Sequence, residues 1–423
     1  MSTLQQTAVV PKSIFFGWWL VAATFVCFAF SASTICFVTF GVFVVPLENE
    51  FGWTRAEITF ASTLASLSSA VIALIAGALL DRFGPRRILL LSIPCFSTAV
   101  ASLYFLPNNL YVLYAFWILI PFAGIGCWPT TFSKATVAWF DRRLGLAVGI
   151  GAAGIGVGAV IVPLIAAALM VNFGWRLAYV GIALISLLIT WTAAALFIFD
   201  SPAAKGTTID NGITASIAAR PIEAAGLTFR ETARQTTYRL LVVIFFLLGT
   251  TSFGLLVHQV PMLIDRGFAP QGAAKVAATL GVALIVGRLL TGWLIDRYFA
   301  PHVMAAYLIG ALIAFSIYAT GQTGPIVVVS AILMGLLLGG EFDVLAFVIR
   351  RYFGYRSFGK IYGSLYAIFQ LGGAIGTFAA GYVRTSTGTY TIAMWGFAVL
   401  CAIIIVIFMM LGPYDKLERG QPA

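Results

Sequence analysis

The sequence predicts an all-α membrane protein with twelve transmembrane helices, arranged as two pseudo-symmetric halves of six helices each. Three observations predict this fold class. Hydrophobic residues make up 61% of the chain and charged residues only 9%, so polar groups could not cover a soluble surface. The apolar residues form runs long enough to cross a bilayer. One stretch of sequence also recurs 215 positions further along the chain.

The apolar runs are about 20 residues long, the length that crosses roughly 30 Å of hydrocarbon. They begin near Phe16, Ile58, Arg87, Leu110, Leu144, Trp175, Leu240, Ala273, Val303, Pro325, Ile361 and Tyr390. We therefore expect twelve spans joined by short loops, with no extramembrane domain that could carry separate chemistry.

The distribution of Lys and Arg predicts the orientation, because these residues are retained on the cytoplasmic side. With the amino terminus inside, the outer loops hold only Arg55, Arg176, Arg266, Lys275 and Arg384. We expect a multi-pass protein of the cell inner membrane with both termini cytoplasmic. The net charge of +10 then reflects topology and anionic lipid headgroups, and we do not expect nucleic acid as a partner.

The recurring stretch is a loop cassette that ends the second span and returns after the eighth. Residues 77–84 read GALLDRFG, and residues 292–299 read GWLIDRYF. Two homologous membrane halves are typical of transporters that rock about a central site. We expect a first half at 1–199, a cytoplasmic linker at 200–238 and a second half at 239–423. Within the linker, residues 229–234 form either a short amphipathic helix on the membrane surface or part of a disordered tether.

A glycine-rich string at 149–158 contains the pattern G-x-G-x-x-G. In a soluble protein that pattern suggests a dinucleotide site, but the site needs a preceding strand and a helix amino terminus facing a phosphate. Here the string lies within the fifth apolar span. Small residues four apart let membrane helices approach closely, so we interpret the string as a packing face.

The first cassette carries the pattern G-x-x-x-D-R-x-G-x-R-R, formed by Gly77, Asp81, Arg82, Gly84, Arg86 and Arg87. With twelve spans, two halves and a central loop, it resembles the major facilitator superfamily over nearly the whole chain. Three further segments, GWW at 17–19, WFDRRLGLA at 139–147 and GRLLTG at 287–292, resemble bacterial relatives of the monocarboxylate porters and the oxalate/formate exchangers.

The resemblance implies a role for Arg288, because an arginine of span eight binds the substrate carboxylate in monocarboxylate porters. Two departures concern proton coupling. Some of these porters place an acid one helical turn before that arginine, where this chain has Leu284, and some use a lysine in span one that is lacking here. The coupling residue therefore cannot be carried over from the family.

Four full charges lie within predicted spans, where each costs roughly 2.5–3.5 kcal/mol at the bilayer centre. Arg288 lies eight residues before Asp296 and hence about 12 Å along the helix, near mid-depth. Its planar fork suits a carboxylate, so we favour substrate binding over a permanent salt bridge.

Glu341 and Asp343 lie at a similar depth in span ten, and residues two apart do not share a helix face. We expect at most one to point into a central cavity and the other to meet a neighbouring helix. A buried carboxyl is easier to protonate than an exposed one, so either could couple protons. A permanent partnership with Lys134 or Arg288 is an equally good interpretation. For Lys134 we favour snorkelling or pairing at the inner gate over substrate contact.

His258 in span seven is followed by Gln259, and we consider both as substrate contacts. A histidine titrates near physiological pH, although most lone histidines in apolar helices are merely hydrogen-bonded. Aromatic and amide groups near the buried charges are further candidates for the cavity wall: Phe37, Trp128, Tyr366, Phe369 and Gln370. The chain offers no cluster of metal ligands, and we expect neither a metal nor a cofactor.

The family resemblance also implies that the cassette aspartates, Asp81 and Asp296, lock the inner helix ends when the outer side is open. We assign Arg82, Arg86 and Arg297 to the same gating role. The second cassette lacks counterparts of Gly84, Arg86 and Arg87, so its lock is expected to be the weaker one.

The leading hypothesis is a secondary transporter of small organic anions, monocarboxylates or aromatic acids, that acts as a monomer by proton-coupled symport. It is not expected to be an enzyme, since no pair of nucleophile and base is visible. The alternatives are carboxylate exchange of the oxalate/formate type, export of drugs or metabolites, and a transporter-like receptor that binds a ligand and signals.

Overall fold

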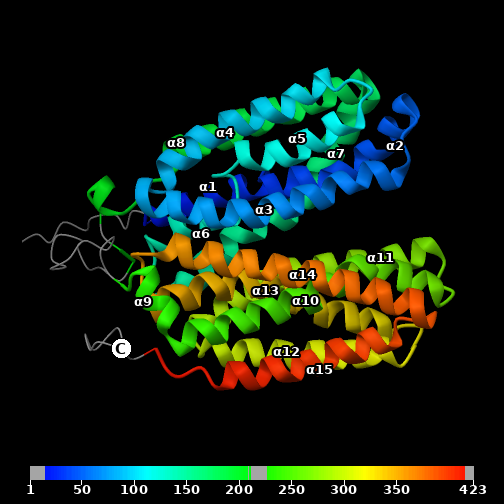
Figure 1. Cartoon of the computed structure of the whole chain (residues 1–423). Helices are drawn as coiled ribbons and strands as arrows, with labels where there is room; N and C mark the ends of the chain where they lie inside the picture. The colour runs from blue at the N-terminus through cyan, green and yellow to red at the C-terminus, as the bar shows by residue number, and fades with distance from the viewer. Residues whose placement is uncertain (1–14, 208, 211–225, 415–423) are drawn as a thin grey trace, which may run out of the picture.

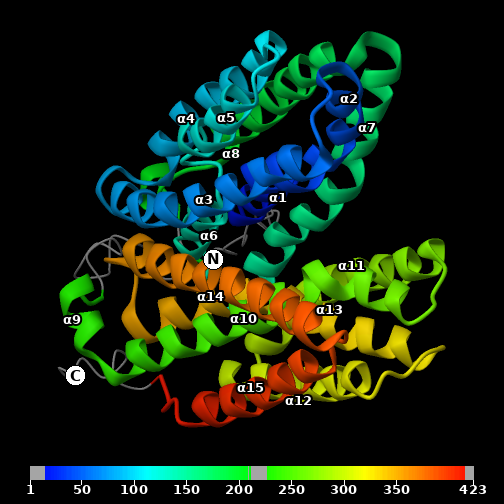
Figure 2. The ribbon, with the colours of Figure 1, turned by 45° about the vertical axis from the view of Figure 1, so that its right-hand side comes forward.

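The helices of the protein form two bundles that lie side by side in the computed structural model, which describes residues 15–207, 209–210 and 226–414 (Figures 1 and 2). The first bundle contains α1 (Gly17–Ala29), the π-helix η1 (Thr34–Thr39), α2 (Phe40–Phe51), α3 (Arg55–Phe83), α4 (Pro85–Ala101), the 3-10 turn η2 (Ser102–Phe105), α5 (Leu110–Ala123), α6 (Pro129–Val137), α7 (Leu144–Ser186), the π-helix η3 (Leu187–Trp191) and α8 (Thr192–Phe197). The second contains α10 (Thr236–Asp265), α11 (Pro270–Ile295), α12 (Ala300–Ala319), α13 (Ile326–Phe353), α14 (Phe358–Thr387) and α15 (Thr391–Met409). One buried apolar core lies within the first bundle, and a second fills the second bundle and continues into the first through residues such as Leu20, Trp139 and Leu144.

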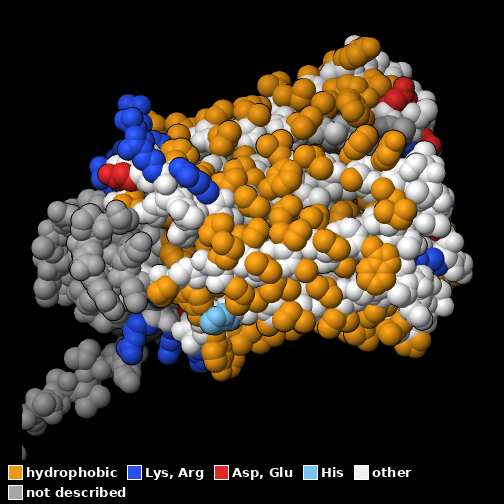
Figure 3. Space-filling view, turned by 60° about the horizontal axis from the view of Figure 1, so that its bottom comes forward, with side chains coloured by type: hydrophobic (Ala, Val, Ile, Leu, Met, Phe, Trp, Pro, Cys, Tyr) orange, Lys and Arg blue, Asp and Glu red, His pale blue; other side chains and the backbone are white. Residues whose placement is uncertain are grey.

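Nine helical stretches in the described part of the chain are long and apolar enough to cross a membrane. One of them, Leu144–Phe197, turns at Gly174, whose φ of 79° is open to glycine but not to other residues without strain, and it therefore crosses twice. The α5–α6 pair and α14 supply the remaining crossings, so the expected all-helical fold of two six-span halves is confirmed. On the face shown in Figure 3, hydrophobic side chains cover the middle of the molecule, while Lys and Arg side chains gather mainly at one end.

Two spans that the sequence predicts as continuous helices are broken. The first is interrupted between α1 and η1, and the fourth is interrupted between α5 and α6. Trp128, which precedes Pro129 at the start of α6, has an extended backbone, the conformation favoured before a proline. At this depth backbone groups must find partners within the protein, and here the two breaks satisfy each other, because Ala32 N–H donates to the carbonyl of Cys127 at 3.2 Å.

The linker includes a short turn, η4 (Ala203–Lys205), and the helix α9 (Phe229–Arg234), which is the helical alternative considered for this segment. Thr228 and Glu231 form a reciprocal capping box at its start. The hydrogen bonds from Thr228 hold the pKa of Glu231 below its ordinary value. The expected boundaries at 199 and 238 stay a prediction; the helix that follows the linker begins at Thr236.

The end of the molecule that carries the linker is called the linker side below, and the opposite end the far side. The bundles converge on the linker side and diverge towards the far side in both views (Figures 1 and 2).

Candidate functional site

A cavity of about 310 Å³ lies between the two bundles. Its walls come from α1, η1, α3, α6 and α7 of the first bundle and from α10, α11, α13 and α14 of the second. The breaks in the first and fourth spans put Ser33, Pro129 and Ser133 on its surface. Both halves therefore contribute to one site.

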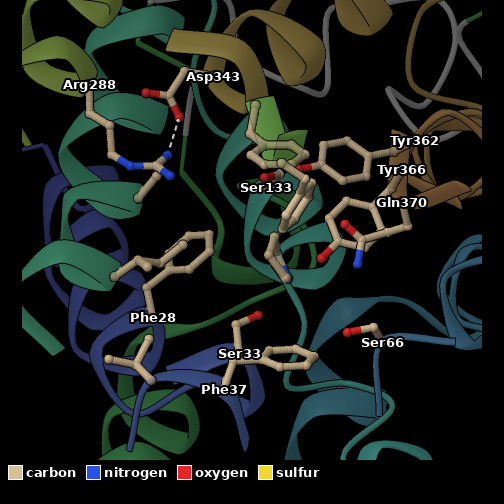
Figure 4. Close-up of a pocket in the computed structure, with 16 residues that line it drawn as sticks. Phe28, Ser33, Phe37, Ser66, Ser133, Arg288, Asp343, Tyr362, Tyr366 and Gln370 are labelled. Atoms are coloured by element: carbon tan, nitrogen blue, oxygen red, sulfur yellow. Dashed lines mark hydrogen bonds and ion pairs between the residues drawn. The ribbon is translucent and has the colours of Figure 1, made fainter. Parts of the chain in front are cut away.

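Arg288 on α11 and Asp343 on α13 are the only charged residues among the described residues that line this cavity. The Arg288 Nη1 donates to Asp343 Oδ1 at 3.1 Å (Figure 4). The two residues are only 4% and 1% exposed, respectively. The pair is joined at a single point, because Arg288 Nε and Asp343 Oδ2 are buried without a partner among the described residues. An arginine fork can bind a carboxylate at two points, so this pair leaves binding capacity unused.

Tyr362 on α14 also lines the cavity and is fully buried, with its hydroxyl beside Ser133. Buried polar groups in folded proteins are nearly always satisfied, so the two orphaned atoms of Arg288 and Asp343 in one cavity wall indicate a site made for a polar ligand or water. The sequence had not suggested Tyr362 as a wall residue. The signal was its spacing of four from Tyr366, which places both rings on one helix face.

Of the residues predicted to surround the substrate, Arg288, Phe37, Tyr366 and Gln370 line the cavity, as does Asp343. Glu341 does not. Its carboxylate accepts a hydrogen bond at 3.0 Å from Ser252 on α10, inside the second bundle. One acid of span ten thus faces the cavity while the other meets a neighbouring helix.

His258 and Gln259 do not line this cavity, and their contact with substrate stays a prediction. His258 is hydrogen-bonded through Nδ1 to the Tyr390 hydroxyl at 3.2 Å and through Nε2 to the carbonyl of Thr377 at 3.0 Å. Gln259 donates to the Tyr318 hydroxyl at 2.8 Å within the second bundle. Span seven does contribute to the cavity, but through Phe253.

Trp128 and Phe369 do not line the cavity either, but stand behind residues that do. Trp128 lies 6.3 Å from the ring of Phe37 and donates to the carbonyl of Pro121. Phe369 packs against Phe342 with ring centroids 4.9 Å apart. Both fix the orientation of wall residues. The aromatic and polar wall residues that the sequence did not suggest are Phe28, Ser33, Ser66, Ser133, Phe253, Phe342 and Tyr362; Val38, Pro129, Ala152 and Ile155 complete the wall.

On the linker side, Asp81 at the end of α3 joins the two halves. Its carboxylate accepts the backbone N–H groups of Gly359 at 2.8 Å and Lys360 at 2.9 Å, which begin α14 in the second half. Lys134 on α6 donates to the same carboxylate at 2.6 Å and to the carbonyl of Leu80 at 2.8 Å. A helix amino terminus favours negative charge, so this carboxylate is stabilised from two directions.

Asp296, at the end of α11, makes the mirror-image contact with the first half. It accepts the N–H groups of Gly145 at 2.6 Å and Leu146 at 2.9 Å, at the start of α7. No Lys or Arg among the described residues lies within 4.0 Å of this carboxylate. The two cassettes thus share their geometry but differ in charge.

Arg82, Arg86 and Arg297, to which gating was assigned, make no hydrogen bond or ion pair with the other half among the described residues. Arg86 donates to the Ala195 carbonyl at 2.8 Å, which ties α4 to α8 within the first bundle. Arg82 lies against Phe83 and Arg297 against Trp293, each on its own helix. The gating role assigned to them stays a prediction, and their observed contacts are local.

Glycines line the contact between the halves on this side. A Cβ on Gly77 would collide with the Gly359 carbonyl, and one on Gly363 with the Ala73 carbonyl. Where α7 of the first half meets α11 of the second, a Cβ on Gly149 would lie 2.6 Å from the carbonyl of Arg288. In the same glycine-rich string, Gly154 faces α1, which agrees with a packing face rather than a nucleotide site.

A further contact involves the linker itself. Asp210 accepts the consecutive N–H groups of Asp141 at 2.7 Å, Arg142 at 3.1 Å and Arg143 at 2.9 Å. Asp141 pairs in turn with Arg351 of the second half at 3.1 Å. The linker side is therefore closed by contacts from both halves and from the segment between them.

A family model, Major Facilitator Superfamily, matches residues 21–340 and 240–423. The chain belongs to the major facilitator superfamily. This identity makes it a secondary transporter and a multi-pass membrane protein, not an enzyme.

Within the superfamily, the chain is 25% identical to human monocarboxylate transporter 11 over 404 residues, covering 91% of this chain and 82% of that protein. It is 24% identical over 383 residues to the uncharacterized transporter YcxA of Bacillus subtilis (strain 168), covering 88% of this chain and 90% of YcxA. The fold resembles the crystal structure of the transporter FucP in its outward conformation, with a TM-score of 0.70, 16% identity and coverage of 93% and 98% of the two chains. The chain is thus distantly related to the monocarboxylate transporters.

Proposed function

We propose that this superfamily member carries small organic anions with a single carboxylate, monocarboxylates or aromatic acids, together with a proton. The observation that supports this most strongly is the ion pair of Arg288 and Asp343 in the cavity wall, which is joined by one hydrogen bond and leaves polar atoms of both side chains without a partner. Arg288 is the one cation among the described wall residues, and its Nε has no partner there. A substrate carboxylate is the ligand whose geometry suits that fork.

In this mechanism the substrate carboxylate replaces Asp343 on Arg288. A buried carboxylate that loses its cation is strongly disfavoured, so Asp343 takes up a proton as the substrate binds. The site then holds the same net charge before and after binding. On release the proton leaves and Asp343 returns to Arg288.

The charge balance also gives a reason for proton coupling. An anion that enters alone works against roughly 2.3 kcal/mol per charge for each 100 mV of an inside-negative potential. An anion that enters with one proton is neutral and avoids that cost. A dicarboxylate would bring a second charge for which the described cavity wall offers no cation. This disfavours oxalate-like substrates.

The relatives named monocarboxylate transporters support the same substrate class. We place the linker side in the cytoplasm of a cell with an inner membrane, since the cations concentrate there. The state observed is closed on that side, and the contacts of Asp81 and Asp296 are the ones that must open for release. Glu341, held by Ser252, is the reserve candidate for the proton.

The test is uptake of radiolabelled benzoate and pyruvate into proteoliposomes containing the purified full chain. Acid outside should drive accumulation above the level reached without a gradient. The variant Asp343→Asn should keep counterflow, in which internal substrate exchanges with external label, and lose accumulation driven by the gradient.

Three outcomes would contradict this proposal. Absence of uptake of any carboxylate would overturn the substrate class. Flux that requires internal substrate and ignores pH would favour the exchanger. If Asp343→Asn accumulates substrate under the gradient as well as the wild type does, another group carries the proton. Glu341→Gln is then the next variant to measure.

A further inference from the structure

The cavity has two polar ends of different character. Arg288 and Asp343 form the charged end in the second half, and Ser33 and Ser66 lie at the opposite end, in the first half (Figure 4). Ser66 donates to the carbonyl of Ser62 at 2.9 Å and keeps its lone pairs as acceptors. The Ser33 hydroxyl has no hydrogen bond to another described residue in the structure. This hydroxyl end, formed by Ser33 and Ser66, can recognise a neutral polar group.

Aromatic rings surround the space between the two ends. Phe28, Phe37 and Tyr366 lie on this wall. Two of these rings are supported from behind, Phe28 by Phe132 at 4.7 Å between centroids and Phe37 by Trp128 at 6.3 Å. Supported rings offer a fixed apolar slot, and aromatic pairs favour stacked or edge-to-face contact with another ring.

The volume of the cavity is large for the smallest carboxylic acids. A three-carbon acid such as pyruvate has about six non-hydrogen atoms and would leave apolar wall of the 310 Å³ cavity facing empty space or poorly bound water, at a cost in lost contacts. A benzoate ring with one further polar atom contacts more of this wall.

We propose, on the basis of the function proposed above, that the substrate is an aryl carboxylate with a neutral hydrogen-bonding group at the end remote from the carboxylate. The carboxylate binds Arg288, the ring lies between the aromatic walls, and the remote group binds Ser33 and Ser66. The substrate then touches both halves at once. Ser33 and Ser66 are specificity-determining residues for its remote end.

The experiment measures dissociation constants of three probes on the purified full chain by calorimetry: pyruvate, benzoate and 4-hydroxybenzoate. One good hydrogen bond is worth about fivefold to tenfold in affinity. We expect 4-hydroxybenzoate to bind about tenfold more tightly than benzoate, and benzoate more tightly than pyruvate. In Ser33→Ala/Ser66→Ala the two aryl acids should bind equally, because the preference for 4-hydroxybenzoate is lost.

The matched control is Ser102→Ala, because Ser102 donates only to the carbonyl of Ala99 and lies outside the cavity. If the double variant does not give a cooperative melting transition, the single variants Ser33→Ala and Ser66→Ala carry the test, each with a partial loss of the preference. Equal affinity of the wild type for benzoate and 4-hydroxybenzoate, or tightest binding of pyruvate, would overturn this inference and leave the proposed function intact. Binding of none of the three would overturn both.

Discussion

The two seams where the halves meet have the same backbone geometry and different charges. In the first seam, α3 packs on α14, with Gly77 against Gly359 and Ala73 against Gly363. The second seam packs α11 on α7, with Gly292 against Gly145 and Arg288 against Gly149. Each position of α3 corresponds to the position of α11 that lies 215 residues later.

The charges break this symmetry at two levels. On the linker side, Asp81 has Lys134 beside it, whereas Asp296 relies on backbone N–H groups. At mid-depth, Ala73 of the first seam corresponds to Arg288 of the second. The backbone contacts that recur in both seams give the halves a symmetrical surface to move on. Arg288, which has no counterpart in the first seam, forms the site, and Lys134 makes the Asp81 contact the stronger of the two contacts that close the linker side.

The largest difference between the seams should appear in Asp81→Ala and Asp296→Ala. Both variants lose two backbone hydrogen bonds to a charged acceptor, but only Asp81→Ala strips a buried cation of its carboxylate, which costs about 3–5 kcal/mol. We expect Asp81→Ala to open the linker side more. Maleimide labelling of Ala138→Cys, a buried position in the linker-side core, measures this in a Cys95→Ser background. Equal labelling of the two variants would contradict the difference between the locks.

Removing the cation as well should equalise the seams. In the double variant Asp81→Ala/Lys134→Met, the buried ammonium group is removed together with its carboxylate. The first seam has then lost two backbone hydrogen bonds, the same number that Asp296→Ala removes from the second seam. Labelling and melting temperature should return to the level of Asp296→Ala. A double-mutant cycle with Lys134→Met alone gives the coupling energy, and additive effects would mean that the 2.6 Å pair contributes nothing.

Backbone contact should matter equally in both seams. Gly363→Ala and Gly149→Ala each force a methyl group against a carbonyl of the opposite half, and such overpacking costs roughly 1–3 kcal/mol. We expect similar losses of uptake, about tenfold to a hundredfold, in proteoliposomes. Gly281→Ala on α11 is the control, since a Cβ there meets nothing within 4 Å. Loss of uptake in only one of the two variants would show that the α3–α14 and α7–α11 surfaces do not move alike.

The smallest effect is expected from the linker. Asp210→Ala removes the acceptor of three N–H groups beside the Asp141–Arg351 pair, on a partly exposed surface. We expect about 1 kcal/mol less stability of the closed linker side, visible as a modest rise in Ala138→Cys labelling. Labelling as strong as in Asp81→Ala would show that the Asp210 contact stabilises the closed linker side as much as the Asp81 contact does.

The sequence predicted the fold well, for physical reasons, and it placed Arg288 and Asp343 in the spans that line the cavity. Apolar run lengths and the repeat define the spans and halves, and an arginine at mid-depth such as Arg288 is too costly to lack a partner. The breaks in spans one and four were not predictable from hydropathy, because the unpaired backbone is satisfied between two segments far apart in sequence.

The direction in which a side chain points was the second feature that the sequence could not predict. His258 lies in a span that contributes to the cavity, yet Tyr390 and Thr377 satisfy it on the side facing its own bundle. Tyr362 and the serines of the wall carry no sequence signal of their own, since tyrosine and serine are common in the spans. Only the packing of two halves decides which of them face the cavity.

The most direct test of the central claim, that the asymmetric Arg288 binds the substrate carboxylate, is a titration of benzoate followed by thermal unfolding. A ligand that binds the folded state raises its stability in a saturable manner. The wild type and Lys275→Gln, an exposed cation on the same helix, should show this rise, whereas Arg288→Gln should melt cooperatively and show none. A saturable rise of the same size and midpoint in Arg288→Gln would contradict the account.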